Sequence, residues 1–511
     1  MATASAGAGR LSGTRTAVTS GTASAPLRST IPARLDRLPW GRFHTRLVIA
    51  LGVAWVLDGL EITIASAIGP RLQENGVLGL SAGQVGFAAS VYLFGEVVGA
   101  LVFGRLSDKL GRRKLFIATL GLYLVANGIT ALAFDYWWLL AFRFFAGMGI
   151  GGEYAAINSA IDELIPAKHR GHTDLAINGT YWLGAIIGSA STIVLLDPHV
   201  LSADLGWRLG LLVGPVIGLA IWGLRRHLPE SPRWLLAHGK ADEAEAAMRQ
   251  IEDQVVAGGK DIAVVDDSHA IEIKDPGSAT FREIAQVMLR DYRKRTVVGM
   301  ALGISQSFLY NAIFFTYTLI LTKCYGISTA GAAKFLFAFA IGNLLGPLTI
   351  GRLFDTVGRR PMIAGTYISS GVLLGVTGWL FKTGSLTATT QTLLWCVIFF
   401  IASAAASSAY LTVSEVFPVE IRAQAIAMFF AVWQLVGGVV APWVFGTLIG
   451  TGDRDALFIG YLIGALLMVL GGVLQALFGV EAARRSLEEV ARPLSSTVRA
   501  TGVRPRESTA L

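Results

Sequence analysis

Twelve long apolar runs constrain the fold of this chain more than any other feature of its sequence. Each run holds about 20 residues, the length of a helix that crosses the hydrocarbon core of a bilayer. The runs are continuously apolar, which favours helices over the alternating strands of a membrane barrel. They fall into two sets of six, at about 47–70, 85–103, 115–134, 137–161, 175–196 and 209–224, and then at about 296–321, 332–350, 362–381, 393–413, 425–449 and 456–480. The sequence therefore predicts an all-α integral membrane protein with twelve transmembrane helices in two six-helix repeats.

Composition supports this reading and assigns a direction to the helices. Hydrophobic residues make up 53% of the chain and charged residues only 15%, too few for a soluble globular domain. The net charge of +8 comes from Lys and Arg gathered in alternate loops and both termini. Positive loops stay on the cytoplasmic side, so we expect a multi-pass protein of the cell membrane with both termini cytoplasmic and no nucleic-acid partner.

The polar segments divide the chain into five parts. Residues 1–46 are expected to form a disordered cytoplasmic tail, 47–228 and 293–480 the two bundles, 229–292 a cytoplasmic loop with short helices, and 481–511 a second disordered tail. The central loop carries no phosphate-binding loop that would indicate a primary pump. Neither an enzyme, a cofactor nor a metal site is expected, because the histidines lie mainly in loops and the two cysteines, Cys324 and Cys396, are far apart.

A charged turn occurs once in each half. "GRLSDKLGRRK" from Gly104 recurs as "GRLFDTVGRRP" from Gly351, at an offset of 247 residues. A second motif, E-x-x-P-x-x-x-R, starts at Glu163 and again at Glu415, at an offset of 252 residues. These echoes indicate two homologous halves, a plan in which transporters hold a site between the repeats near the middle of the membrane.

The repeated charges predict a cytoplasmic gate. Arginines and carboxylates at one face can form ion pairs that break as the two halves rock. Basic loops that only set topology are the alternative, but they do not explain the fixed spacing of Gly and Asp. The predicted gate residues are Gly104, Arg105, Asp108, Arg112, Glu163, Arg170, Asp355, Arg359, Glu415 and Arg422.

Three motifs resemble those of one transporter superfamily. "GRLSDKLGRR" resembles the cytoplasmic signature of the major facilitator superfamily, "RFFAGMGIGG" from Arg143 is similar to a motif in helix 4 of its sugar porters, and "PESPRWLL" from Pro229 follows the sixth helix as it does there. The resemblance covers about 47–480 and implies a secondary transporter that works by alternating access.

Departures from the sugar porters bear on the substrate. The seventh helix keeps Gln306 and Asn311, but Phe315 and Thr316 stand where tyrosines are usual, and the G-P-x-x-W stretch of the tenth helix is missing. "DGLE" from Asp58 and "GGEY" from Gly151 look more like proton symporters of niacin, aromatic acids and other metabolites. An organic or aromatic acid is therefore favoured. A sugar or polyol symporter, an uncoupled facilitator and, less favoured, a non-transporting sensor are the alternatives.

Ionisable residues inside the apolar runs are candidates for proton coupling. An unpaired charge there costs about 3 kcal/mol or more, so each should face a partner or a cavity. The resemblance implies that Asp58 pairs with Arg143 and that breaking this pair moves a proton; a fixed structural salt bridge is the alternative. Glu61 shares a helix face with Asp58. Glu153 is either a second carrier or a group that polarises the surroundings of an anionic substrate, and Glu96 is as much a candidate for a plain helix contact.

Polar and aromatic residues of helices 5, 7 and 11 are candidates for contact with the substrate. Helices from both halves would then share one cavity. The predicted substrate-binding residues are Asn178, Trp182, Gln306, Asn311 and Trp433. The expected partners are a small molecule, protons and lipid, and the expected state is a monomer.

Overall fold

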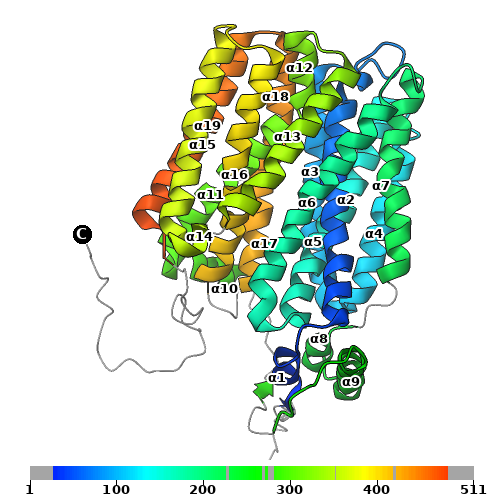
Figure 1. Ribbon diagram of the computed structural model, residues 1–511, viewed down its shortest axis with the longest axis vertical. Helices are drawn as coiled ribbons and strands as arrows, with labels where there is room; N and C mark the ends of the chain where they lie inside the picture. Colours follow the sequence, from blue (N-terminus) through cyan, green and yellow to red (C-terminus); the bar gives the residue numbers. More distant parts are fainter. Residues whose placement is uncertain are drawn as a thin grey trace, which may run out of the picture.

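Two helical bundles stand side by side in the computed structural model (Figure 1). The structure describes residues 27–225, 230–266, 271–273, 281–351, 353–417 and 422–481. Apart from one short antiparallel pair, β1 (Leu27–Ser29) with β2 (Ile271–Ile273), the regular structure of this part is helical. Nine of its helical segments are long and apolar enough to span a membrane. The predicted all-α fold is confirmed.

The first bundle, which we call the N-bundle, contains the six long helices of the first repeat: α2 (Arg42–Leu72), α3 (Ala82–Leu110), α4 (Arg112–Thr130), α5 (Tyr136–Leu164), α6 (Ala167–Leu195) and α7 (Ala203–Arg225). The second, the C-bundle, contains α11 (Arg293–Phe314) with α12 (Tyr317–Tyr325), α13 (Thr329–Ile350), α15 (Arg359–Lys382), α16 (Ala388–Val416), α17 (Arg422–Trp433) with η3 (Gln434–Val439) and α18 (Val440–Thr451), and α19 (Arg454–Phe478). Short α10 (Phe281–Gln286), η2 (Val287–Asp291) and α14 (Leu353–Thr356) lie in the connections.

Two crossings of the C-bundle are irregular. The seventh crossing breaks at Phe315 and Thr316, between α11 and α12. The eleventh contains the π-helical segment η3, which includes the pair Gly437 and Gly438. Such π-helical segments widen a helix locally and often mark functional positions.

Glycines bring matching helices of each bundle into backbone contact. A Cβ atom at Gly99 of α3 would overlap the carbonyl oxygen of Met148 on α5. In the C-bundle a Cβ atom at Gly346 of α13 would overlap the carbonyl oxygen of Phe400 on α16. These positions are related by the offsets of 247 and 252 residues found in the sequence. Small residues at such crossings let helices approach closely, so both halves share one packing frame.

The bundles meet at the end opposite the basic turns, which we call the far end. Ser66 Oγ on α2 donates to the carbonyl oxygen of Phe314 at 2.6 Å. Ser90 Oγ on α3 accepts from the backbone N–H of Trp443 at 3.1 Å. Hydrogen bonds from both early helices therefore join the halves at this end.

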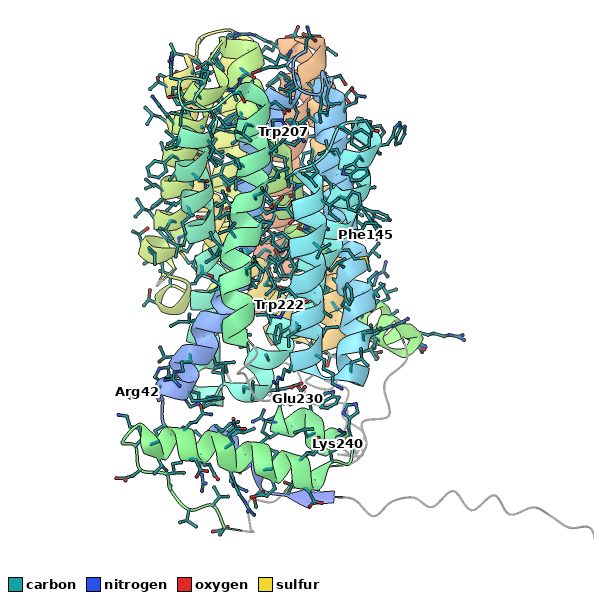
Figure 2. All side chains as sticks on the ribbon, turned by 90° about the vertical axis from the view of Figure 1, so that its right-hand side faces the viewer. Arg42, Phe145, Trp207, Trp222, Glu230 and Lys240 are labelled. Atoms are coloured by element: carbon teal, nitrogen blue, oxygen red, sulfur yellow. The ribbon has the colours of Figure 1, made fainter. Side chains whose placement is uncertain are left out.

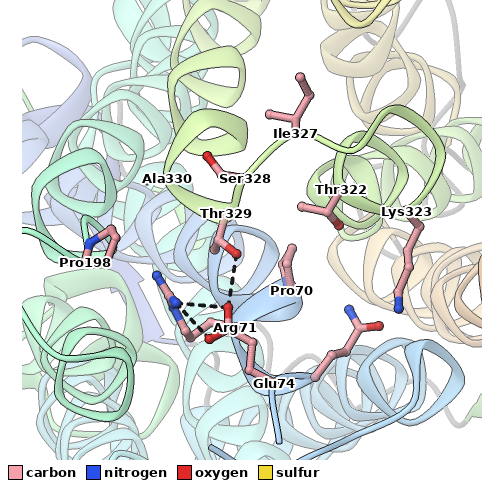
Figure 3. Close-up of a pocket in the computed structure, with 11 residues that line it drawn as sticks. Pro70, Arg71, Glu74, Pro198, Thr322, Lys323, Ile327, Ser328, Thr329 and Ala330 are labelled. Atoms are coloured by element: carbon pink, nitrogen blue, oxygen red, sulfur yellow. Dashed lines mark hydrogen bonds and ion pairs between the residues drawn. The ribbon is translucent and has the colours of Figure 1, made fainter. Parts of the chain in front are cut away.

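A cavity of about 440 Å³ opens at the far end, between α2 and the start of α13. Figure 3 shows Arg71 and Glu74 on one wall and Thr329 on the other. The Arg71 side chain is buried and donates to Glu74 at 2.8 Å and to the carbonyl oxygen of Leu196 at 2.7 Å. Thr329 donates to Glu74 at 3.5 Å, so this ion pair also touches the other half.

A small helical subdomain covers the basic end of the N-bundle. It contains α1 (Ile31–Asp36), α8 (Pro232–Ala237) and α9 (Ala241–Ala257), which lie below the bundle in Figures 1 and 2. Leu35 of α1 is buried in one apolar cluster with Met248 and Ile251 of α9. Because this cluster also includes residues of α4, α5 and α6, the subdomain packs on the N-bundle.

An ionic clasp holds α1 against α9. Arg34 donates to Glu245 at 2.7 Å and to Glu252 at 2.5 Å, and Arg37 also pairs with Glu252 at 2.5 Å. Burial raises the pKa of Glu252, but the hydrogen bonds and charges of the two arginines outweigh it and leave the pKa below the ordinary glutamate value of 4.5.

The clasp corrects the predicted disorder of residues 1–46. Residues 27–46 form β1, α1 and the start of α2, because the apolar side chains of α1 and the carboxylates of α9 give this segment a surface to pack on. Residues 1–26 and 482–511, where disorder was also predicted, lie outside the described part.

Candidate functional site

Four acids and one arginine are buried within the N-bundle, each at most 4% exposed: Asp58, Glu61, Glu96, Glu153 and Arg143. They come from α2, α3 and α5, the helices that the glycine contacts hold together. Charges buried at this depth need partners or a function, because hydrocarbon and packed protein both solvate them poorly.

Glu61 is the most fully satisfied of these carboxylates. Its Oε1 pairs with Arg143, and its Oε2 accepts from Tyr123 at 3.2 Å and from Asn127 at 2.6 Å. Removing any one donor leaves the others in place. The Glu61–Arg143 pair is therefore a fixed junction of α2, α4 and α5.

Arg143 pairs with Glu61 rather than with Asp58, which corrects the expected Asp58–Arg143 pair. Arg143 lies about two turns from the far-end start of α5, and Glu61 lies about three turns from the far-end terminus of α2. Asp58 is three residues further from that terminus, about 4.5 Å deeper at 1.5 Å per residue. Glu61 is therefore closer than Asp58 to the depth of Arg143 and is the better placed partner.

Asp58 is held by neutral donors. The hydroxyl of Tyr92 donates to its Oδ1 at 3.4 Å, and the hydroxyl of Tyr154 donates to its Oδ2. The guanidinium of Arg143 lies over the Tyr92 ring, 4.4 Å from its centre, so Tyr92 stands between the aspartate and the arginine. The charges of Glu61 and Glu153 are both close enough to act on Asp58. Asp58 thus makes no ion pair with a basic side chain of the described residues.

Glu96 links the two halves. Its Oε2 accepts from the Gln434 side-chain amide at 3.1 Å, and Gln434 is the first residue of the π-helical segment η3. Its Oε1 is buried and makes no hydrogen bond within the described part of the chain. A buried carboxylate oxygen without a hydrogen bond destabilises the fold, so this position needs an explanation other than packing.

The predicted substrate residues divide by what they contact. Trp182 of α6 meets Tyr310 of α11 with ring centres 5.8 Å apart, so it joins the halves. Gln306 donates to the carbonyl oxygen of Ala402 at 3.1 Å, while its own amide oxygen is buried and makes no hydrogen bond with any described residue. Asn311 donates to the backbone of its own helix.

Trp433 and Asn178 stand apart from this group. A Cβ atom at Gly303 would overlap the Trp433 indole, so Trp433 packs tightly against α11. Its indole N–H is buried and finds no acceptor among the residues that the structure describes. Asn178 lies half-buried on α6, one turn before Trp182. Its part in a site remains a prediction.

Most of the predicted gate cannot be compared with the structure. The side chains of Asp108, Arg112, Arg170, Asp355, Glu415 and Arg422 lie outside the described part. Gly104 and Arg105 lie near the end of α3, and Glu163 and Arg359 are partly buried at the same basic end.

Each repeated turn is bound by one acid that was not predicted from the sequence. Glu230 accepts from the backbone N–H of Arg113 at 3.3 Å, at the start of α4. Glu481 accepts from the backbone N–H of Arg359 at 2.8 Å, at the start of α15. Figure 2 shows Glu230 at the base of the N-bundle. The signal was present, because both acids follow the sixth helix of their half and their offset, 251 residues, is close to those of the other repeats.

Comparison with known proteins agrees with this architecture. The sequence matches the family described as "Sugar (and other) transporter" over residues 60–494. The niacin transporter NiaP of Acinetobacter baylyi is 27% identical over 413 residues, which cover 81% of this chain and 89% of that protein. The inner membrane metabolite transport protein YgcS of Escherichia coli is 26% identical over 423 residues, 81% of this chain and 88% of that protein.

Solved structures show the same fold. The crystal structure of a D-xylose-proton symporter superposes with a TM-score of 0.66 at 21% identity, covering 86% of this chain and 99% of the symporter. The family match extends well beyond half of the chain. The protein is thus a multi-pass membrane transporter and not an enzyme, and it belongs to the sugar (and other) transporter family of the major facilitator superfamily.

Proposed function

We propose that this protein is a secondary active transporter that couples the movement of a small organic metabolite to protons by alternating access. The observation that carries the proposal is Asp58, a buried carboxylate that two tyrosine hydroxyls alone hold among the described residues, beside the Glu61–Arg143 junction. A carboxylate in this setting can gain or lose a proton without breaking an ion pair.

The two acids on α2 take different roles in this mechanism. Glu61 is the structural acid, because it is bound to Arg143 and to two further donors. Asp58 carries the proton, and Tyr92 and Tyr154 follow its charge state through their hydroxyls. Glu153 is buried on α5 next to Tyr154, which binds Asp58, and is the proposed second carrier.

Alternating access requires the contacts at the far end to break. The hydrogen bonds of Ser66 and Ser90 to the C-bundle close that end in this structure. The basic turns, with the predicted ion pairs of the gate, would close the opposite end when the far end opens. The positive-inside rule supports a cytoplasmic location for the basic end, both termini and the α8–α9 subdomain. The proposed state is a monomer in the cell membrane.

The similarity to a niacin transporter supports an organic or aromatic acid as the substrate, and the likeness to a xylose symporter fits a sugar equally well. An uncoupled facilitator is the alternative mechanism.

Uptake by purified protein in proteoliposomes tests this function. A panel of labelled sugars, acids, amides and amines is offered with and without an imposed pH gradient, acid outside. We expect one chemical class to accumulate above its external concentration only while the gradient lasts. Uptake that stops at equilibrium and ignores the gradient would establish the facilitator, and vesicles that take up no compound faster than protein-free controls would contradict the function.

A further inference from the structure

We infer that Glu96 recognises a positively charged nitrogen on the transported molecule, so that the substrate is an amine or a quaternary ammonium compound. The inference deepens the proposed function and rests on it, since it names the substrate class of the same site. The sequence favoured an organic acid because its motifs resemble those of acid transporters. The buried carboxylates of Glu96 and Asp58 favour a cation instead.

Glu96 is buried and only partly hydrogen-bonded among the described residues. The side chain is 1% exposed and lies between the halves, with Oε2 bound to Gln434 and Oε1 unsatisfied among the described residues. Gln434 contributes a neutral donor, which cannot neutralise a carboxylate. Any cation would supply the missing positive charge, and a protonated amine would in addition donate a charge-assisted hydrogen bond to Oε1.

No basic side chain of the described residues forms an ion pair with Glu96. Arg143 pairs with Glu61 through Nη1, while its Nη2 is buried and makes no hydrogen bond with a described residue. Asp58, whose charge acts on Glu96, is held by tyrosines and brings a second acid toward the same place. An anionic substrate would meet two carboxylates and an arginine whose charge Glu61 already balances, whereas a cation would meet complementary charge.

Aromatic side chains of both halves surround Glu96. Tyr92 lies one turn before Glu96 on α3, and Tyr154 and Tyr410 are close enough for the Glu96 charge to act on their hydroxyls. Tyr154 meets Phe430 at 5.5 Å between ring centres, and Tyr410 meets Trp433 at 5.2 Å, so these rings come from both halves. Aromatic faces attract cations and are a recurrent means of binding ammonium groups.

The repeat supplies an internal comparison. The residue 247 positions after Glu96 is Asn343, which is fully buried and satisfied by Tyr310 at 3.3 Å and by the carbonyl oxygen of Phe339 at 3.0 Å. A helix contact alone is thus served by an amide at this position. The acid in the N-bundle adds a charge that packing does not need.

Binding of charge-matched probes tests the inference. Nicotinate, nicotinamide and 1-methylnicotinamide share one ring and are anionic, neutral and cationic; benzoate, benzamide and benzylamine repeat the series. The ligand-induced rise of the melting temperature and the Kd by calorimetry are measured for the purified wild-type protein, Glu96→Gln, Glu96→Asp and Glu243→Gln. The last variant makes the same chemical change on the exposed face of α9.

We expect the cation of at least one series to bind the wild-type protein and Glu243→Gln about tenfold or more tighter than its neutral partner, a preference that Glu96→Asp retains in part and Glu96→Gln loses. Tighter binding of the anion, an unchanged preference in Glu96→Gln, or no binding by any cation would overturn the inference and leave Glu96 as a helix contact with Gln434.

Flux in the same proteoliposomes separates this inference from the proposed function. Proton-driven accumulation of an anion would remove the inference and keep the function. Glu96-dependent binding of a cation whose uptake ignores the pH gradient would keep the inference and remove proton coupling.

Discussion

The two bundles share a packing frame but differ in buried charge. Gly99 against Met148 in the N-bundle and Gly346 against Phe400 in the C-bundle make the same backbone contact at repeat-related positions. The N-bundle buries four acids and Arg143 between these helices and α2. In the described part of the C-bundle, the buried polar residues are instead amides and hydroxyls, among them Gln306, Asn311, Asn343, Gln391 and Gln475.

This difference indicates a division of labour between duplicated halves. Close helix crossings depend on residue size, so both copies retain them. A buried charge is retained only where it contributes to function or is compensated, because it destabilises the fold otherwise. We therefore assign the charge-dependent steps to the N-bundle and neutral contacts with the substrate to the C-bundle.

The largest expected effect comes from the Glu61–Arg143 junction. Arg143→Met should lower the free energy of unfolding by about 3–5 kcal/mol, because it leaves Glu61 buried without its basic partner. The double variant Glu61→Gln/Arg143→Met should recover most of this loss. The matched change in the C-bundle, Gln306→Leu, removes one hydrogen bond and should cost about 1 kcal/mol.

Thermal unfolding of the purified variants in one detergent measures these differences. A double variant as unstable as Arg143→Met would show that packing of the arginine, rather than its charge, stabilises the junction.

An exchange of the repeat-related pair Glu96 and Asn343 should have opposite effects in the two bundles. Asn343→Asp introduces an uncompensated charge into the C-bundle and should destabilise the protein by about 3 kcal/mol. Glu96→Gln removes a charge and should leave stability unchanged or raise it while impairing transport. Melting temperatures with a transport assay check both. Equal destabilisation by the two variants would contradict the proposed asymmetry.

The shared frame predicts equal costs for equal changes. Gly99→Ala and Gly346→Ala each place a methyl group against a carbonyl oxygen of the neighbouring helix and should each cost about 1–3 kcal/mol. A methyl group at Gly128, which faces open space, is the control and should be neutral or slightly stabilising. A large difference between the first two variants would mean that the halves do not share this crossing.

The smallest effect concerns the ionic clasp, which only the N-bundle carries among the described residues. Arg34→Ala should cost about 1 kcal/mol and increase hydrogen exchange in α1 and α9 without unfolding either bundle. Ala33→Ser, a substitution on the same helix that keeps both arginines, is the control.

The clasp also has a predicted pH dependence. Because the pKa values of Glu245 and Glu252 are lowered in the folded protein, their stabilisation is fully present above the ordinary glutamate value of 4.5 and is lost as the pH falls through the lower folded values. Exchange in α1, corrected for its intrinsic pH dependence, should therefore be unchanged from pH 7 to about pH 5 and rise only below about pH 4. Loosening already at pH 6 would contradict this assignment.

Sequence patterns predicted the number, type and duplication of the helices because hydrophobicity and length alone determine a membrane crossing. They also identified Asp58, Glu61 and Arg143 as buried charges. They misassigned the partner of Arg143. Asp58 and Glu61 share one face of α2 and differ mainly in depth, so the choice between them depends on the position of α5 along the axis of α2, which the sequence does not give. Glu230 and Glu481 were missed because each acts through backbone N–H groups of a turn distant in sequence.

Proton-driven accumulation in matched variants of the two bundles tests the division of labour most directly. The substrate found in the uptake screen is loaded by an imposed pH gradient into proteoliposomes containing the wild-type protein, Asp58→Asn or Asn311→Ala, and exchange of labelled for unlabelled substrate is measured without a gradient. We predict that Asp58→Asn abolishes accumulation and retains exchange, while Asn311→Ala still accumulates substrate with a weaker apparent affinity. Accumulation by Asp58→Asn, or loss of proton coupling in Asn311→Ala with exchange intact, would contradict the assignment of coupling to the N-bundle.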